Sequence, residues 1–115
     1  MTKFMYLFRG GREKMAAMSA EESQKHMQVW GAWMKSLAAK GTLVDGLPLA
    51  KDGKQVKNGG KIITDGPFAE GAEVVGGYLI VNAKNIEEAV EVSKGCPIFE
   101  TGGEIEVREI LNMDM

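Results

Sequence analysis

The chain has 115 residues, of which 44% are hydrophobic, and its 14 basic and 16 acidic side chains give a formal net charge of −2. This length predicts one domain spanning residues 1–115, large enough to bury a core without disulfides. The slightly negative charge argues against nucleic acid as the main partner, and the single cysteine, Cys96, excludes a disulfide within these residues.

The first apolar run lies within residues 3–9 and is too short for a signal peptide or a membrane-spanning helix. Together with the lone cysteine, it predicts a cytoplasmic protein that has no membrane partner. Zinc-ligand spacings, phosphate-binding loops and dinucleotide fingerprints do not occur in the sequence. We therefore expect neither a metal site nor a cofactor.

The charge is unevenly distributed along the chain. Residues 1–61 carry 11 basic and 5 acidic side chains, a net of +6, whereas residues 62–115 carry 3 basic and 11 acidic side chains, a net of −8. A basic half could bind RNA, but no aromatic-basic recognition motif accompanies its lysines. We expect instead that the two halves interleave in one fold, so that opposite charges become neighbours.

Residues 3–9 predict a strand whose two faces are both apolar. Phe4, Tyr6 and Phe8 point to one side, and Met5 and Leu7 point to the other. Such a strand is typical of the middle of a sheet that is covered on both faces. Helices can cover one face, and a second subunit is the simplest cover for the other.

A loop is predicted over residues 10–14, and a long helix after it. Ser19 and Glu22 form a capping box, and Gly41 ends the helix after about Lys40. Gly31 in mid-helix costs about 1 kcal/mol relative to Ala, and we interpret it as a point of close packing. The predicted buried stripe of the helix consists of Met27, Trp30, Met34, Leu37 and Ala38, with His26 and Trp33 along one edge.

Strand-like residues 42–50 are interrupted by Asp45-Gly46 and by Pro48, which predicts an edge or bent strand. Residues 51–54 then predict a tight hairpin turn with Asp52-Gly53 at its tip. Residues 61–64 run onward as another strand. The lysines at positions 51, 54, 57 and 61 form either a solvated hairpin arm, which we favour, or a rim that attracts anions.

Residues 73–82 predict the strongest strand, and Gly76-Gly77 within it indicates a bulge or a close approach of another backbone or of a ligand. A cap at Asn85 begins a short helix, and residues 104–111 form the last strand. The order is therefore βαββαβ. It predicts an α+β ferredoxin-like plait with an inserted β-hairpin, antiparallel neighbours and helices on one face.

The stretch Asp65-Gly66-Pro67-Phe68-Ala69-Glu70 has two interpretations. It is either a turn that ends a strand or a loop that holds Asp65 at the mouth of a pocket. The stretch resembles the signature of the DGPF, or YCII-related, family, the YciI-like branch of the dimeric α/β-barrel superfamily. The resemblance extends to residues 33–49, to the Gly-Gly-Tyr strand at 75–80 and to the Ile-Glu-Val-Arg strand within 103–108.

The resemblance implies a dimeric α/β barrel, a homodimer in which two sheets pack face to face. It also implies a pocket between the sheet and the helices of each subunit for a small-molecule ligand, with a His–Asp pair inside. His26 is the only histidine, so the resemblance points to His26 and Asp65 as the acid/base pair. A structural role for His26 remains open, and in that case Asp65 itself is the candidate acid/base.

Further candidates would bind the substrate. Arg108 matches the arginine of the family's closing strand, where it either anchors an anion or pairs with a carboxylate such as Glu106. Glu70 belongs to the signature and either contacts the ligand or only secures the turn. The remaining candidates, Tyr6, Trp30, Trp33 and Phe68, either line a flat apolar pocket or are plain core.

Two functions follow from these residues and from the resemblance. The first is a cofactor-independent lyase-like or isomerase-like enzyme that uses a His–Asp pair on a small cyclic or enolisable molecule. The alternative is a non-catalytic small-ligand-binding or regulatory module, linked through the family to sigma-factor and transcription functions.

Overall fold

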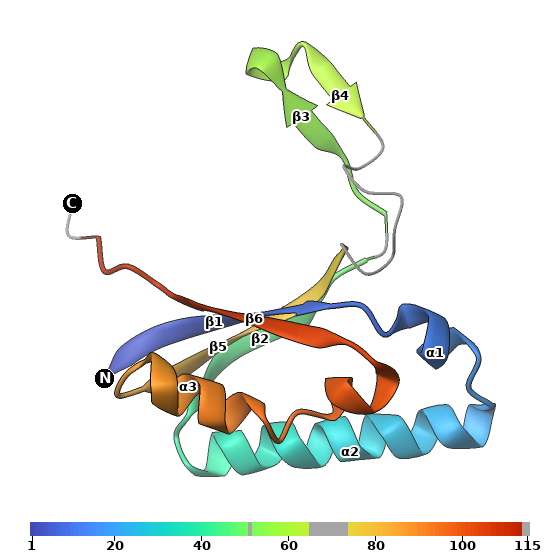
Figure 1. Cartoon of the computed structure of the whole chain (residues 1–115), viewed down its shortest axis with the longest axis vertical. Helices are drawn as coiled ribbons and strands as arrows, with labels where there is room; N and C mark the ends of the chain where they lie inside the picture. The colour runs from blue at the N-terminus through green and yellow to red at the C-terminus, as the bar shows by residue number, and fades with distance from the viewer. Residues whose placement is uncertain (51, 65–73, 114–115) are drawn as a thin grey trace.

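The computed structural model describes residues 1–50, 52–64 and 74–113. Its elements are β1 (Thr2–Arg9), α1 (Arg12–Ala16), α2 (Ala20–Ala39), β2 (Leu43–Pro48), β3 (Gln55–Lys57), η1 (Asn58–Gly60), β4 (Ile62–Thr64), β5 (Val75–Ala83), α3 (Ile86–Ser93), η3 (Pro97–Thr101) and β6 (Glu104–Glu109). The main sheet has the antiparallel order β2-β5-β1-β6, and β3 pairs with β4 separately (Figure 1). This confirms the ferredoxin-like α+β plait with an inserted hairpin.

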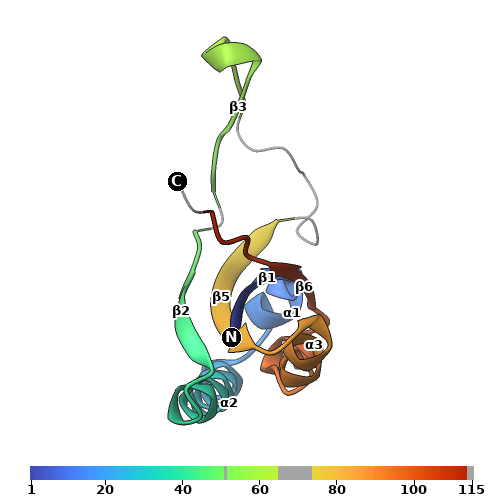
Figure 2. The same cartoon turned by 90° about the vertical axis from the view of Figure 1, so that its left-hand side faces the viewer.

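The helices α2 and α3 lie on the same face of the main sheet, as Figures 1 and 2 show. The core fills the space between these two layers. β1 contributes Phe4, Tyr6 and Phe8 to it, all less than 10% exposed, and β5 contributes Leu79 and Val81. The strict alternation of β1 therefore directs its three aromatic rings toward the helices, as the sequence predicts.

The other face of the main sheet carries a second set of apolar side chains, which we call the open face: Met5, Leu7, Leu47, Tyr78 and Ile80. Leu7 lies opposite Tyr78, and Tyr78 lies opposite Leu47 on the neighbouring strand. Leu47 is 61% exposed within a single chain. The predicted cover for this face, a second subunit, stays a prediction.

The helix α2 begins with the predicted capping box, in which the Glu22 amide donates to Ser19 Oγ and the Ser19 amide donates to the Glu22 carboxylate. His26 and Leu37 are buried on the side of α2 that faces the core, and Trp30, Trp33 and Met34 are half-buried against it. This confirms Trp30, Met34 and Leu37 of the predicted stripe. Within the described ranges, no helix combines the length and the apolar character that crossing a membrane requires.

Two predictions about α2 were wrong. Met27 is 64% exposed and Ala38 is also exposed, because the helix turns the edge marked by His26 and Trp33 toward the core. Gly31 does not mark close packing, since a Cβ added there would meet no atom of residues 1–50, 52–64 or 74–113 within 4 Å.

The loop predicted over residues 10–14 is also wrong in part, because α1 begins at Arg12. Gly10 and Gly11 adopt positive φ angles of 78° and 83°, which ends β1 and turns the chain into this short helix. The Arg12 guanidinium donates to the Leu49 carbonyl oxygen, at 3.3 Å, and so connects α1 with the end of β2.

The hairpin turns at a different place from the one predicted. β3 and β4 are joined through Asn58, Gly59 and Gly60, whose φ angles are 51°, 65° and 93°. Three consecutive positive φ angles favour Asn and Gly, so this triplet and not Asp52-Gly53 makes the turn. Lys51 lies outside the described residues.

Gly76 and Gly77 of β5 show two of the alternatives predicted for them, a bulge and a close approach of another backbone. The register between β1 and β5 shifts between Phe8 and Arg9, opposite this pair, which indicates a bulge. A Cβ on Gly77 would lie 3.2 Å from both Leu47 O and Pro48 Cα, so the β2 backbone passes close by.

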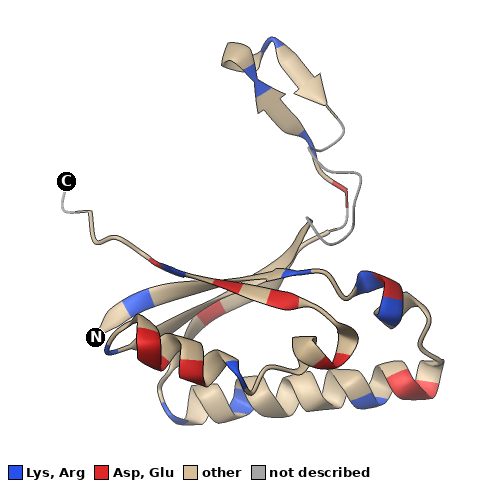
Figure 3. Ribbon diagram, in the orientation of Figure 1, with Lys and Arg blue, Asp and Glu red and all other residues tan. Residues whose placement is uncertain are grey.

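Residues 55–64 form a hairpin of β3 and β4, which we call the arm. In Figures 1 and 2 it stands away from the main sheet, on the side opposite α2 and α3. Val56 lies opposite Ile63, and these side chains are 59% and 62% exposed. The arm carries two charged residues, Lys57 and Lys61, as Figure 3 shows by its blue segments.

Candidate functional site

Three of the predicted site residues lie together along α2. His26, Trp30 and Trp33 are four and three residues apart, so that they follow one another along one side of the helix. The rings of Trp30 and Trp33 meet edge to face with centroids 5.9 Å apart, and His26 approaches Trp30 in the same manner at 6.4 Å. His26 itself is only 5% exposed.

Both ring nitrogens of His26 face polar groups. The Trp30 indole N–H donates to His26 Nε2 at 3.0 Å. A neutral His26 therefore carries its proton on Nδ1, and that nitrogen lies 3.5 Å from Glu100 Oε2. This arrangement holds the imidazole between an indole donor and a carboxylate, which fixes both its orientation and its tautomer.

Glu100 is a candidate that the sequence did not reveal. It lies in η3, which packs against α2, and its side chain is 60% exposed. Nothing in the sequence indicates this contact, because 74 positions separate the two residues and only the packing of η3 on α2 brings them together.

A row of aromatic rings leads from α2 to the sheet. Phe8 contacts Trp30 edge to face, at 5.4 Å between centroids, and it contacts Tyr6 at 6.4 Å. Phe8 was not among the predicted site residues, although its position two residues after Tyr6 places it on the same face of β1. The predicted aromatic surface thus includes a fourth ring in the described residues.

Tyr6 is fully buried, and its hydroxyl donates to the Ala89 carbonyl oxygen of α3. Burial, reinforced by the nearby Cys96, raises the pKa of Tyr6 to about 12. The phenol consequently stays protonated at neutral pH and connects β1 to α3. Burial also raises the pKa of the Cys96 thiol to about 12, in agreement with the structural role that its position at a helix end suggests.

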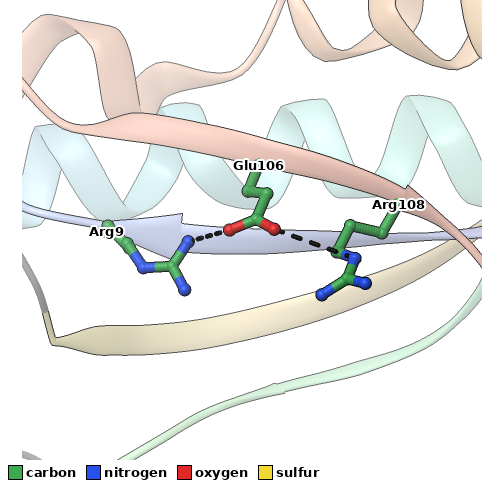
Figure 4. A network of polar contacts seen from close by, with 3 residues as sticks. All are labelled: Arg9, Glu106 and Arg108. Carbon is green, nitrogen blue, oxygen red and sulfur yellow. Dashed lines mark hydrogen bonds and ion pairs between the residues drawn. The ribbon is translucent and has the colours of Figure 1, made fainter.

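Arg108 lies on the opposite side of the sheet from Tyr6. It stands across from Met5 on β1, and its side chain is 70% exposed. Figure 4 shows Glu106 between two arginines: Arg9 Nη1 contacts one carboxylate oxygen, and Arg108 Nε lies 3.8 Å from the other. The ion pair with Glu106 that the sequence offered as an alternative is present, and Arg108 does not join the cluster around His26.

Asp65, Phe68 and Glu70 lie outside the described residues, so the proposed pairing of His26 with Asp65 stays a prediction. Among the residues that are described, no three His, Cys, Asp or Glu side chains form a group that could hold a metal ion.

Comparisons with known proteins identify two similarities. The model of the YCII-related domain matches residues 3–114. The fold is similar to that of 5-chloro-2-hydroxyhydroquinone dehydrochlorinase (TftG) from Burkholderia phenoliruptrix, solved in complex with 2,5-dihydroxybenzoquinone. That likeness has a TM-score of 0.52 at 15% sequence identity, over 98% of this chain and 96% of the other. A search of curated proteins found no match.

Proposed function

This chain belongs to the YCII-related domain family, and from that membership we propose that it is a small cytoplasmic enzyme that moves protons on a cyclic or enolisable molecule. The reaction is of the lyase or isomerase type and uses no cofactor. The family does not by itself fix the reaction, because a shared fold hosts many chemistries.

The observation that carries the proposal is the environment of His26. A buried imidazole with a carboxylate on its Nδ1 side is the arrangement that orients a general base and stabilises it once it is protonated. In this proposal Nε2 takes the substrate proton, and a substrate group replaces the Trp30 indole N–H at that nitrogen. Glu100 and Asp65 are the two candidate carboxylates.

The aromatic rings around His26 support a ring-bearing substrate. Trp30, Trp33 and Phe8 present flat apolar surfaces beside the imidazole, and Phe68 of the signature is a further candidate. The dehydrochlorinase with the similar fold was solved with a quinone, which is a planar ring. Tyr6, Arg108 and Glu70 remain candidates for substrate binding from the family resemblance.

The experiment uses a planar probe. The purified protein is titrated with 2,5-dihydroxybenzoquinone to measure binding, and 5-chloro-2-hydroxyhydroquinone is tested for chloride release. His26→Gln should lower turnover by about 10²- to 10⁴-fold, as expected when a general base is lost. Glu100→Gln and Asp65→Asn then show which carboxylate orients the imidazole.

Lys25→Gln serves as the control, because Lys25 precedes His26 on the same helix and its side chain is 74% exposed. Its turnover should match that of the unmodified chain. Full activity in His26→Gln would contradict the proposed role of this residue. If the protein turned over none of a panel of enolisable ring acids, the proposal that it is an enzyme would be contradicted.

One observation favours the alternative, a non-catalytic ligand-binding or regulatory module. The lone pair of His26 Nε2 is already occupied by the Trp30 N–H, which suits a histidine that only secures α2 against η3. In that case His26→Gln lowers the melting temperature but leaves ligand affinity within a factor of about two. The two functions therefore predict different results for His26→Gln. The enzyme should lose turnover, whereas the module should lose only thermal stability and keep its ligand affinity.

We also propose that the protein is a homodimer formed through the open face. The five apolar side chains of that face lie on three neighbouring strands. Leu47 is 61% exposed and the other four are half-buried within a single chain, so a second copy would remove their remaining surface from water. A stable interface buries on the order of 800 Å² on each partner, and sedimentation measures whether the open face forms one. The superfamily resemblance implies the same face-to-face contact.

A further inference from the structure

In the part of the chain that the structure describes, the arm contributes no side chain to the core. The core residues come from the main sheet, the two long helices and η3, whereas the arm strands pair with each other. An isolated two-stranded hairpin is marginally stable in water and needs a packing partner. The exposed pair Val56 and Ile63, which face each other across the arm, is a surface suited to such a partner.

The position of the arm indicates where the partner lies. The arm projects from the side of the sheet that carries the open face, and residues 110–113 rise from the same side at the opposite end of the sheet (Figure 1). Leu111 and Met113 in that segment are 73% and 72% exposed. A second copy seated on the open face would therefore lie between two segments with exposed apolar side chains.

The dimensions of the molecule allow the arm to reach past the sheet of such a copy. The longest extent of the chain is 48 Å, and it runs from α2 to the tip of the arm (Figure 1). One sheet with its helix layer accounts for roughly 20 Å of this length, since layers pack about 10 Å apart. The remaining length matches the distance to the helix layer of a copy stacked on the open face.

The charges of the arm and of α3 are opposite, which indicates α3 of the second copy as the surface for the arm. The arm is basic through Lys57 and Lys61, whereas α3 contains three glutamates and no basic residue within its bounds (Figure 3). Glu91 pairs with Lys94 just after the helix, so Glu87 and Glu88 are the acidic side chains offered to the arm. The helix α3 also exposes an apolar pair one turn apart, Ile86 at 44% and Val90 at 39%. An apolar pair beside acidic side chains complements an apolar pair beside lysines.

We propose that the arm of one copy packs on α3 of a second copy, placing its apolar pair on the apolar pair of α3 and its lysines beside the α3 glutamates. The arm is then a clasp that extends the interface from the open face to the helical layer of the partner. This inference rests on the homodimer proposed above.

The direct test is an isotope-filtered NMR experiment on dimers mixed from labelled and unlabelled chains. Nuclear Overhauser contacts should join the methyl groups of Val56 and Ile63 in one copy to those of Ile86 and Val90 in the other. Contacts confined to one copy, or contacts with another surface of the partner, would overturn the proposal.

A second measurement uses charge reversal and sedimentation. Lys57→Glu combined with Lys61→Glu should raise the dimer dissociation constant by about tenfold, equivalent to ~1.4 kcal/mol. Adding Glu87→Lys on α3 should restore part of the affinity. The matched control is Lys35→Glu with Lys40→Glu, which makes the same charge change on exposed positions at the end of α2.

The results separate this inference from the homodimer itself. If the arm substitutions change the dimer dissociation constant no more than the control substitutions do, the open-face interface stands and the clasp is overturned. A chain that is monomeric before any substitution overturns both. The arm lies outside the core, so circular dichroism of the variants should match that of the unmodified chain.

Discussion

Two glycines of this fold, Gly46 and Gly31, should respond to alanine substitution with opposite changes in stability. A Cβ on Gly46 would lie 2.2 Å from Leu79 Cδ2 and 2.6 Å from the Tyr78 carbonyl oxygen, which is too close for any side chain. Gly31 sits in open space on α2. Gly46→Ala should therefore destabilise the protein by about 1–3 kcal/mol or more, and Gly31→Ala should stabilise it by about 0.5–1 kcal/mol. Urea unfolding of both variants measures the two signs, and equal effects would contradict this explanation.

From the raised pKa values of Tyr6 and Cys96 we expect the protein to lose stability at high pH. Both groups have pKa values raised by folding, from 10.0 and 9.0 to about 12. Their protonated forms are thus favoured in the native state, and this contribution is complete below the unfolded values and is lost as the pH rises through about 12. The free energy of unfolding should fall between about pH 9 and pH 12.

The control for this decline is Tyr6→Phe, which should flatten the upper part of the pH profile. It should also cost about 0.5–1.5 kcal/mol at neutral pH, since the Ala89 carbonyl loses its donor. A profile that keeps its full slope in Tyr6→Phe would assign the decline to other groups.

At the scale of elements, α2 depends on its first turn. Hydrogen bonds from the Ser19 backbone and side chain lower the pKa of Glu22, and the Ser19 hydroxyl in return caps the helix. Ser19→Ala should cost about 1 kcal/mol at neutral pH. A lowered folded pKa gives stability that is present above the ordinary value of 4.5 and is lost as the pH falls through the folded value. Ser19→Ala keeps the backbone N–H that is the larger cause of the lowered Glu22 pKa, so the loss of stability in acid should persist in Ser19→Ala and disappear in Glu22→Gln. A decline in acid that remains in Glu22→Gln would assign it to other groups.

The elements that could be predicted from sequence are those whose residues specify them locally. The alternation of β1, the capping box of α2 and the bulge at Gly76 are decided by neighbouring residues, and all of them are present. The hairpin turn was misplaced because Asp52-Gly53 and Asn58-Gly59-Gly60 are both good turn sequences, and strand pairing chooses between them. The contact of Glu100 with His26 depends on the packing of η3, which no local pattern encodes. Which side of α2 faces the core was predicted only in part, because several apolar residues compete for the same stripe.

At the scale of the whole molecule, the open face predicts the oligomeric state. Leu7 lies at its centre, between Tyr78 and Glu106, and Leu7→Glu would bury a second carboxylate beside Glu106, whose contacts already engage Arg9 and Arg108. Leu7→Lys could pair with Glu106, so Leu7→Glu is the sharper variant. It should convert the dimer to a monomer in sedimentation experiments. Met27→Glu is the matched control, since Met27 is 64% exposed on the helical side and should leave the dimer intact.

The two lysines of the arm have one more consequence, for solubility. β3 and β4 present free strand edges together with Val56, Ile62 and Ile63, a combination that in other proteins nucleates cross-β aggregation. Lys57 and Lys61 bracket the turn that joins these strands, and like charges keep the arms of separate molecules apart. Acetylation of these lysines should remove that repulsion and raise the tendency of the chain to aggregate, which light scattering would detect.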